Sequence, residues 1–394
     1  MRELKIAIIG AGIAGLTAAR ALQTFGFRPQ VFEQSPELGE VGAGLTISSN
    51  ATHVLNAIGL ADVMPVIGLR PDQGGVKHWR TGETMIEIMR GDEMLQRYGA
   101  AYYQVHRADL HDALAERVRQ TDPDAIHLGR RFRSMAVQGG TTTLAFETGA
   151  SIVADVVIGA DGSRSAVRRA LFGALEPRFT GFIAYRGLVP RTALPGEAER
   201  PSLLRPTSCI SIGPGHTFAR YLIRGGNTVN FVGLAERDDW REEGWSIRSS
   251  VEELSREFAG WYEDLQTIIR AAPPDQLFKW ALFDRDPLPT WTQGSTTLIG
   301  DSAHPMLPFL GQGAAMGIED GMVIARAFAE SDSIATALAR YEAARHERTT
   351  FVLEKSRETG RSYHAANPDT YRGTHHLSAE SLGLMSYNAT TVSI

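Results

Sequence analysis

The sequence has little of several features that mark particular protein classes. Its 394 residues include one cysteine, Cys209, so no disulfide can form within the chain and no cysteine cluster can hold a metal. We expect Cys209 to be a small buried side chain. Asp and Glu (45) outnumber Lys and Arg (40), and a net charge of −5 gives no general attraction for nucleic acid or anionic membrane. No uninterrupted apolar run reaches about 18 residues, so no membrane-spanning helix is expected.

Signals for export and disorder are also missing. The apolar start, KIAIIGAGIAG, is broken by glycines and runs into a helical pattern without a clear cleavage region, which argues against a signal peptide. Apolar residues make up 43% and charged residues 22%, an ordinary globular balance that excludes disorder and collagen. No repeat or low-complexity tract is visible. We therefore expect a cytoplasmic globular protein that works on small molecules.

The first forty residues have the pattern of a βαβ unit. LKIAIIG is a β-branched run that predicts a buried parallel strand, and the stretch from Ile13 to Gly26 predicts a helix. Gly10, Gly12 and Gly15 lie between them as GAGIAG. Glycines at this spacing permit a tight turn and let the backbone approach a pyrophosphate at the start of the helix. Strand, turn and helix in this order predict a dinucleotide site.

Glu33 lies at the end of the second predicted strand, RPQVFEQ. A carboxylate at this position can accept hydrogen bonds from a ribose diol, and it would repel a ribose phosphate. NADP in this site is therefore disfavoured. The N-terminal pattern alone leaves both FAD and NAD open.

The middle of the chain changes pattern twice. Helical spacing of apolar residues is found in 49–60 and 108–118. Residues 126–157 alternate apolar and polar side chains around a Gly-Gly turn, which predicts an antiparallel meander. From 181 to 282, strand-like runs precede one helical stretch at 250–271, which predicts a sheet inserted between nucleotide-binding segments.

The C-terminal part returns to the buried-strand pattern in TTLIGD, residues 296–301. Long helices are predicted for 313–330 and 334–364. The last twenty residues are polar, so we expect them to lie at the periphery.

Two further motifs identify a family. ADVVIGADGSRSAVR places Asp161 and Gly162 after a buried strand, and GDSAHPMLPFLGQGAAMGIED begins with Gly300 and Asp301. Together with GAGIAG, this order of motifs resembles the group A flavoprotein aromatic hydroxylases, the family of salicylate hydroxylase, 3-hydroxybenzoate 6-hydroxylase, 6-hydroxynicotinate monooxygenase and the more distant 4-hydroxybenzoate hydroxylase. The resemblance spans residues 4 to about 350.

The resemblance implies an α/β fold in which a Rossmann-like FAD-binding domain carries an inserted β-sheet substrate domain and C-terminal helices. The implied FAD-binding domain is discontinuous, at 1–75, 100–180 and 283–350. The implied substrate domain comprises 76–99 and 181–282, with a C-terminal helix and tail at 351–394. The cofactor implied is FAD, with NADH or NADPH as co-substrate. The chain is expected to be a monomer or a homodimer.

The family's FAD contacts carry over to residues of all three motifs and to the segments between them. Glycine-rich residues near the flavin match Gly42, Ala43 and Gly44, and Arg107 matches an arginine that contacts FAD. The predicted FAD-binding residues are Gly10, Gly12, Ala14, Gly15, Glu33, Gly44, Arg107, Asp161, Gly162, Asp301, Pro308, Gly311, Gln312, Gly313 and Ala314.

The opening residues of the last motif also make physical sense around a flavin. Asp301 ends a buried strand, where a carboxylate needs hydrogen-bond donors such as the ribityl hydroxyls. Pro308 stiffens the turn, while Gly311 and Gly313 let the backbone lie against a flat ring. The start of the helix that follows turns its positive dipole toward the flavin, which would stabilise a reduced, anionic ring.

Substrate and catalytic residues are less clear from the sequence. Arg220 and Tyr221 are neighbours on a predicted strand, so they point to opposite faces and only one can face the substrate. We prefer Tyr221. His304 is a candidate general base, although a structural place near the flavin fits it as well, and His216 is a second candidate that we expect in a surface loop.

The remaining predictions concern the walls of the substrate site. Phe309 and Leu310 suggest an apolar wall for a ring, and Arg186 or Arg220 could hold a carboxylate. The predicted substrate contacts are Thr46, Arg220, Tyr221, Pro305 and Phe309. The 6-hydroxynicotinate enzymes carry histidines where this chain has Thr46 and near Phe309, which makes that activity less expected here.

The implied reaction is the hydroxylation of a small aromatic substrate, hydroxybenzoate-like or salicylate-like, by NAD(P)H and dioxygen through a flavin hydroperoxide. No metal is needed, and His or Cys spacing suggests none. A hydroxypyridine or other N-heteroaromatic hydroxylase and a non-hydroxylating flavin oxidoreductase stay open as alternatives. A flavin-free NAD-dependent dehydrogenase and a non-catalytic flavin-binding protein are further rivals, while no WxWxIP motif supports a halogenase.

Overall fold

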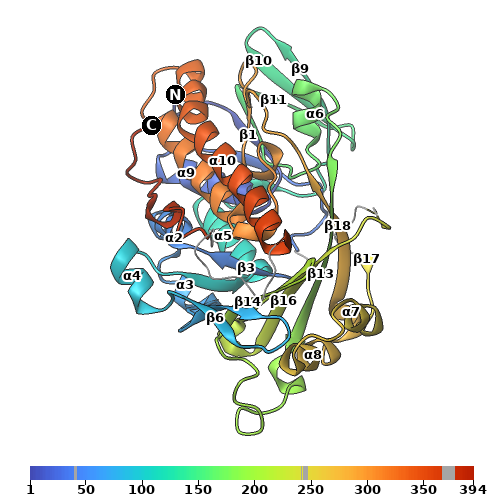
Figure 1. Cartoon of the computed structure of the whole chain (residues 1–394). Coiled ribbons are helices and arrows are strands. Elements are labelled where there is room, and N and C mark those ends of the chain that lie inside the picture. Colours follow the sequence, from blue (N-terminus) through green and yellow to red (C-terminus); the bar gives the residue numbers. More distant parts are fainter. Residues whose placement is uncertain (40–41, 241, 243–246, 366–377) are drawn as a thin grey trace.

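The computed structural model describes residues 1–39, 42–240, 242, 247–365 and 378–394. Figure 1 shows the part predicted to bind a nucleotide around β1, a large sheet below it, and the helices α9 and α10 beside them, with the two chain ends close together. None of the helices among these residues is both long and apolar enough to cross a membrane.

A five-stranded parallel sheet with the order β19-β12-β1-β2-β8 forms the part of the chain that the sequence predicts to bind a nucleotide. Its apolar strands are buried, as expected for a parallel sheet covered on both faces. The strands are β1 (Ile6–Ile9), β2 (Gln30–Phe32), β8 (Ile126–His127), β12 (Val156–Gly159) and β19 (Thr296–Leu298). Strands from distant parts of the sequence thus lie side by side, which brings the three predicted motifs to one end of the sheet.

Helices and a small antiparallel sheet cover this part. Helix α1 packs against α5 and α9. The helices are α1 (Ile13–Thr24), α2 (Ser49–Leu55), α3 (Met64–Ile67), α4 (Asp92–Tyr98), α5 (Arg107–Thr121), α6 (Ala166–Phe172), α9 (Gly313–Ala329) and α10 (Ile334–Ala365). The predicted meander is confirmed for β9 (Phe132–Gln138), β10 (Thr141–Phe146) and β11 (Ser151–Ala154), but its first and last segments became β8 and β12 of the parallel sheet.

The inserted sheet has eight strands in the order β17-β18-β13-β16-β15-β14-β5-β6. Two strands from early in the chain, β5 and β6, extend the sheet beyond β14. Its strands are β5 (Gly74–His78), β6 (Thr84–Ile88), β13 (Arg178–Pro190), β14 (Ser208–Gly213), β15 (His216–Ile223), β16 (Thr228–Glu236), β17 (Ile247–Arg248) and β18 (Leu277–Asp284). A third sheet, β3 (Gly44–Ile47), β7 (Tyr103–His106) and β4 (Gly68–Leu69), lies between the two parts.

The predicted single helix at 250–271 is wrong. The structure has two helices there, α7 (Val251–Glu257) and α8 (Glu263–Arg270), which form the outer layer over one face of the large sheet. The chain turns between them at Gly260, with φ +80°. Phe258 and Trp261 are buried against the sheet at this turn, so the apolar pattern continues although the helix does not.

The C-terminal residues also differ from expectation. Residues 378–394 are polar in sequence, yet Leu384, Met385 and Ala389 are buried. Arg326 of α9 donates to the carbonyl oxygens of Ala389 (3.0 Å) and Val392 (2.7 Å). The last seventeen residues therefore pack onto the C-terminal helices rather than lie at the periphery.

Candidate active site

The glycine turn after β1 is tightly packed on one side and open on the other. A Cβ on Gly10 (φ +107°) would lie 2.5 Å from the carbonyl oxygen of Ala160, and a Cβ on Gly15 would lie 2.0 Å from that of Gly10. A Cβ on Gly12, by contrast, would have nothing within 4 Å. This open side lies at the N-terminus of α1, where backbone amides and the helix dipole favour a pyrophosphate.

Glu33 lies directly beside this turn. Its carboxylate accepts hydrogen bonds from the backbone amides of Ala11 (2.8 Å) and Ser35 (2.9 Å). His111 of α5 donates from Nε2 to the carbonyl oxygen of Ala11 (2.7 Å). The carboxylate predicted to bind a ribose is thus held in place before any ligand arrives.

Asp161 has a more local role than the sequence suggested. Its carboxylate accepts hydrogen bonds from the amides of Ala166 (2.7 Å) and Val167 (3.0 Å) and from the hydroxyl of Ser165. Asp161 therefore fixes the start of α6. Beside it, a Cβ on Gly162 (φ +77°) would meet nothing within 4 Å, so the backbone there is open to a ligand.

Arg168 of α6, which the sequence analysis missed, ties the DG and GD motifs together. Its guanidinium is 4% exposed and donates to the carbonyl oxygens of Ser302 (2.8 Å), Asp301 (3.3 Å) and Ser163. Burial, with a smaller contribution from Arg285, lowers the pKa of Arg168 to about 10, so it stays protonated at neutral pH. The signal for it was its position within GSRSAVR, directly after the DG motif.

The GD turn follows β19 and carries its aspartate toward solvent. Gly300 has φ +58°, and Asp301 is exposed rather than buried. The amide of Gly300 donates to Asp320 Oδ2 (2.8 Å). An exposed carboxylate at the end of a parallel strand is well placed to accept hydrogen bonds from a polyol.

His304 is placed for structure rather than catalysis. Its ring is 3% exposed, its Nε2 lies 2.6 Å from Asp320 Oδ2, and it lies against Trp291. Burial alone would raise the pKa of Asp320, but His304 and Arg345 outweigh it and lower the pKa to about 2. The prediction that His304 is catalytic is therefore not supported, because its side chain faces a buried carboxylate on α9.

A buried polar network holds the start of α9. Arg345 of α10 donates to Asp320 (2.7 Å) and to Glu319 (2.6 Å), and Asn50 donates to Glu319 (2.6 Å). Gln312, predicted to bind FAD, donates instead to Ser48 Oγ (3.0 Å) and is 2% exposed. Its side chain is turned into this network, so only its backbone remains for a ligand.

The residues around Gln312 form the open part of this segment. Gly311 (φ +63°) and Pro308 are exposed, and Gly313 and Ala314 are partly exposed. The hydroxyl of Thr46, on β3, donates to the carbonyl oxygen of Gly311 (3.3 Å). Strand β3 is therefore in contact with the segment that leads into α9.

Gly44, which precedes Thr46 on β3, lies against side chains of the large sheet. A Cβ on Gly44 would lie 2.6 Å from the ring of Tyr221 and 2.7 Å from Asn230, and its amide donates to Asn230 Oδ1 (2.7 Å). Only glycine fits so close to these side chains. Burial raises the pKa of Tyr221, so its phenol is a hydrogen-bond donor rather than a base. Asn230 was missed because nothing in its sequence neighbourhood marks it.

Arg220 points to the other face of the sheet, as strand alternation requires. It is 2% exposed and donates to the carbonyl oxygens of Pro206 (2.9 Å) and Arg205 (3.3 Å). Lys77 also donates to that carbonyl of Arg205 (2.9 Å). The prediction that Arg220 contacts substrate is therefore not supported. His216 begins β15 and pairs with Glu257 of α7 (2.8 Å), so it is neither at the site nor in a surface loop.

An apolar wall closes the site at the end of α10. Phe309 is 8% exposed, and its ring centroid lies 5.8 Å from that of Phe182 and 5.5 Å from that of His364. A Cβ on Gly360 would lie 2.4 Å from the Phe309 ring, so α10 needs a glycine here. Leu310 is buried, and Pro305 is partly exposed.

The two remaining arginines come from different elements. Arg107 begins α5, and its amide donates to the carbonyl oxygen of Ala43 (2.8 Å), at the glycine-rich segment. Arg186 of β13 is 3% exposed, with its guanidinium over the rings of Phe278 (5.0 Å) and Trp280 (5.7 Å). Strand alternation puts Arg186 on the same face as Phe182.

These positions fit FAD. The open backbone at Gly12 suits the pyrophosphate, Glu33 suits the adenosine ribose, and exposed Asp301 suits the ribityl chain. Residues 311–314 offer backbone and a helix start for the flavin ring. Among the residues that the structure describes, no His, Cys, Asp and Glu side chains gather into a metal site.

Comparison with known proteins gives the same answer. The FAD binding domain family matches residues 3–189 and 223–356. A 3-amino-4-hydroxybenzoate 2-monooxygenase of Streptomyces platensis is 37% identical over 361 residues, covering 91% of this chain and 88% of that protein. A 6-hydroxynicotinate 3-monooxygenase of Pseudomonas fluorescens is 33% identical, covering 90% of each. A 3-hydroxybenzoate 6-hydroxylase of Polaromonas naphthalenivorans is 32% identical, covering 92% and 89%.

Solved structures agree on the fold. Klebsiella pneumoniae HpxO in complex with FAD and uric acid superposes with a TM-score of 0.84 at 26% identity, covering 98% of this chain and 97% of that one. A salicylate hydroxylase substrate complex superposes with a TM-score of 0.82 at 26% identity, covering 98% and 96%. The expected FAD cofactor and aromatic hydroxylase fold are confirmed, and the chain belongs to the FAD-dependent aromatic monooxygenases.

Proposed function

We propose that this enzyme hydroxylates a small aromatic acid of the hydroxybenzoate type, with NADH or NADPH as reductant and dioxygen as oxidant. The observation that carries the proposal is the contact of Gly44 with Tyr221 and Asn230. It sets the inner face of the large sheet directly against the segment that holds the flavin. FAD, when bound, supplies the activated oxygen, and the chain has to hold a ring beside it.

The walls of this space suit an aromatic ring. Ala184, Leu234 and Phe309 belong to one apolar cluster on the inner face of the sheet, and partly buried Val232 and Trp280 pack against it. Such walls exclude water from the reacting groups, which strengthens every polar contact made there. A flat apolar substrate body is therefore favoured over a polar, flexible one.

The polar groups of the site suggest how the ring is oriented. Tyr221 offers a protonated phenol. The hydroxyl of Thr46 donates to the carbonyl oxygen of Gly311 and can still accept a hydrogen bond. Arg186 is the arginine of the predicted pair that lies on the inner face, and we assign it the substrate carboxylate. Asn230 positions the Gly44 amide and so acts on the flavin side of the site.

The cofactor-binding roles predicted for Ala14, Pro308, Gly313 and Ala314 are part of the same proposal, as are the substrate contacts of Thr46 and Pro305. We also infer that the enzyme works in the cytoplasm, where NAD(P)H is available. The single cysteine is consistent with a reducing compartment.

A panel of aromatic acids tests the proposal. The FAD-loaded protein would be given NADH or NADPH, dioxygen and, in turn, 3-hydroxybenzoate, salicylate, 3-amino-4-hydroxybenzoate and 6-hydroxynicotinate, and the products would be separated and identified. We expect a hydroxylated product from at least one benzoate. If only 6-hydroxynicotinate gave a product, the substrate would be a hydroxypyridine acid rather than a benzoate. Oxidation of NADH or NADPH without any aromatic product would contradict hydroxylation.

A further inference from the structure

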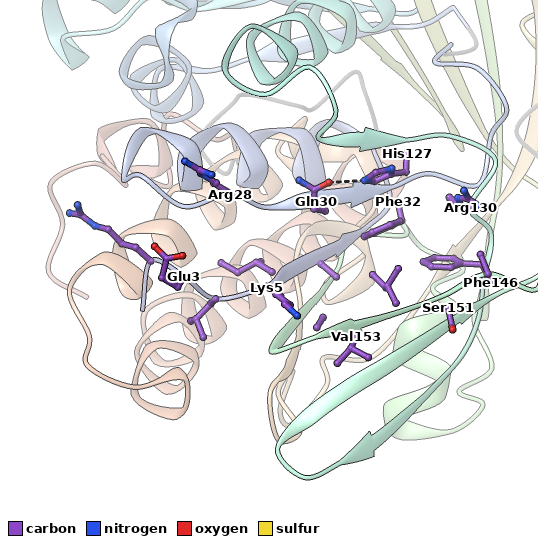
Figure 2. Close-up of a pocket in the computed structure, with 17 residues that line it drawn as sticks. Glu3, Lys5, Arg28, Gln30, Phe32, His127, Arg130, Phe146, Ser151 and Val153 are labelled. Carbon is purple, nitrogen blue, oxygen red and sulfur yellow. Dashed lines mark hydrogen bonds between the residues drawn. The ribbon is translucent and has the colours of Figure 1, made fainter.

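A cavity of about 570 Å³ lies away from the residues assigned to FAD and substrate. It is bounded by β1, β2 and β8 on one side and by β10 and β11 on the other, as Figure 2 shows. Its size falls within the range of small-molecule sites, which is roughly 300 to 1,000 Å³. None of the roles described above uses it.

Aromatic rings line one end of the cavity. The Phe32 ring stacks on His127 with centroids 4.8 Å apart and on Phe146 at 5.1 Å. His127 donates from Nε2 to Gln30 Oε1 (2.7 Å), and burial, followed by the nearby Arg130, lowers the pKa of His127. The imidazole is therefore uncharged at neutral pH. Because Phe32 (5% exposed) and Phe146 (1% exposed) are buried, the partly exposed His127 is the member of this stack that a ligand can reach.

Positive charge surrounds these rings. Arg2, Lys5, Arg28 and Arg130 line the cavity, with Glu3 as the acidic residue among its lining. Figure 2 shows Arg28 and Lys5 toward one end and Arg130 near the rings at the other. The side chains of Arg2, Lys5 and Arg28 make no ion pair with any residue the structure describes. A local excess of cations on a chain with net charge −5 favours an anionic ligand.

We propose that this cavity is a second ligand site, which binds a planar aromatic ring carrying a carboxylate or phosphate. The ring would lie against the partly exposed His127 and the aliphatic side chains of Leu4, Ile152 and Val153, which also line the cavity. The anionic group would meet Arg28, Lys5 or Arg130. Two kinds of molecule share this chemistry: an aromatic carboxylate and an adenine mononucleotide. Both can be tested separately.

The cavity shares residues with the FAD site. The carbonyl oxygen of Phe32 accepts a hydrogen bond from the amide of Gly10 (2.9 Å), in the glycine turn. The amide of Arg130 donates to the carbonyl oxygen of Glu33 (2.7 Å). A ligand that orders these side chains also orders the backbone that holds Glu33. Its binding and FAD binding should therefore favour each other by the same factor, because linkage is reciprocal.

Binding measurements on the FAD-loaded protein test this proposal without turnover. Benzoate and AMP would each be titrated by calorimetry, while the visible absorbance of the flavin reports any occupation of the catalytic site. We expect one binding event that leaves the flavin spectrum unchanged. The same ligand should raise FAD affinity in a separate dialysis measurement.

Substitutions of residues that line the cavity test whether the calorimetric binding event takes place there. Val153 lines the cavity and is 49% exposed, so Val153→Trp should fill the space without disturbing the core. We expect it to abolish the event, and Lys5→Glu with Arg28→Glu to weaken it at least about tenfold, about 1.4 kcal/mol. Arg119→Glu, an exposed substitution on α5 outside the cavity, should change nothing.

The outcomes separate the two ligands and the two proposals. A spectrally silent event with benzoate identifies an aromatic carboxylate, and one with AMP alone identifies a nucleotide. The second site is overturned if neither ligand gives such an event, or if Val153→Trp leaves it intact. Loss of the second site would not affect the hydroxylation proposal, which is decided by product analysis.

Discussion

Arg168 and Ser302, which are far apart in sequence, are joined by a 2.8 Å hydrogen bond from the guanidinium to the carbonyl oxygen. Because the same guanidinium also bonds Asp301 and Ser163, one buried arginine joins the DG segment to the GD turn. The backbone of Asp301, whose carboxylate is expected to hold the ribityl chain, is therefore held in place by Arg168. Arg168 is a positioning residue.

Replacing Arg168 by alanine should weaken FAD binding about tenfold or more, since a hydrogen bond from a charged donor is worth about 1.5–3 kcal/mol. Arg168→Lys should recover part of the loss, because a single ammonium cannot reach all three carbonyl oxygens. FAD dissociation constants measured by dialysis check this. Arg169→Ala, an exposed neighbour on α6, is the control, and equal losses in both variants would contradict the assignment.

FAD affinity should depend on both the charge and the shape of the side chain at position 33. In Glu33→Gln the amide oxygen can still accept from Ala11, so FAD affinity should fall by a factor of about 3–10. Glu33→Ala removes both acceptors and should cost more. The exposed Glu37→Gln provides a matched control, measured by the same FAD titration. An unchanged FAD affinity in Glu33→Ala would contradict the assignment of Glu33 to the adenosine ribose.

The buried pair of Asp320 and His304 makes a prediction about pH. The folded-state pKa of Asp320 is lowered to about 2, below its ordinary value near 3.9, so its contribution to stability is present above about pH 4 and is lost as the pH falls toward 2. Asp320→Asn should destabilise the protein by about 3–5 kcal/mol at neutral pH, because Arg345 is left buried with less compensation.

Urea unfolding at pH 7 and at low pH measures this effect. The difference between wild type and Asp320→Asn should shrink as the pH approaches 2. Asp332→Asn, at an exposed position before α10, should unfold like wild type. A difference that does not depend on pH would show that packing, not charge, holds the GD turn to α9.

Tyr221→Phe separates substrate handling from cofactor binding. The variant keeps the ring that lies against Gly44 and loses only the phenol proton donor. We expect kcat/KM for the aromatic substrate to fall about tenfold, with FAD content unchanged. Steady-state kinetics based on product formation measure it. Tyr98→Phe, on α4, is the matched control, and equal kinetics in the two variants would mean that Tyr221 does not contact substrate.

The sequence was informative where backbone geometry dictates residue type. The glycine turn, the DG and GD segments and the start of α9 all require glycine or a strand end at fixed spacing. Those requirements are local, so Gly10, Gly15 and Gly300 could be recognised without a structure. Their convergence at one end of a parallel sheet follows from the fold rules for such sheets.

Side-chain direction on the large sheet could not be predicted in the same way. Because side chains alternate along a strand, Arg220 and Tyr221 must point to opposite faces of the sheet. Both faces are covered, however: α7 and α8 cover one, and the FAD-binding part of the chain covers the other. Although Tyr221 was preferred for the ligand side, Arg220 was also offered there as a contact for a substrate carboxylate. It is buried on the helix side instead, because the carbonyl oxygens of Arg205 and Pro206 satisfy it there.

Contacts between segments that are distant in sequence could not be predicted either. The sequence left His304 open as either a general base or a structural residue, because its partner, Asp320, lies on a helix whose rotation is fixed only by packing. Asn230 and Arg168 act through backbone groups far away in the chain, and no local pattern records such partners. The break between α7 and α8 was hidden because Phe258 and Trp261 continue the apolar spacing through the turn.

The most direct test of hydroxylation is to run the reaction of the FAD-loaded enzyme with isotopically labelled dioxygen and a benzoate from the panel. One labelled oxygen atom in each molecule of hydroxylated aromatic product is the predicted result. Oxidation of NAD(P)H that yields only hydrogen peroxide with every aromatic acid, or a product whose new oxygen comes from water, would contradict it.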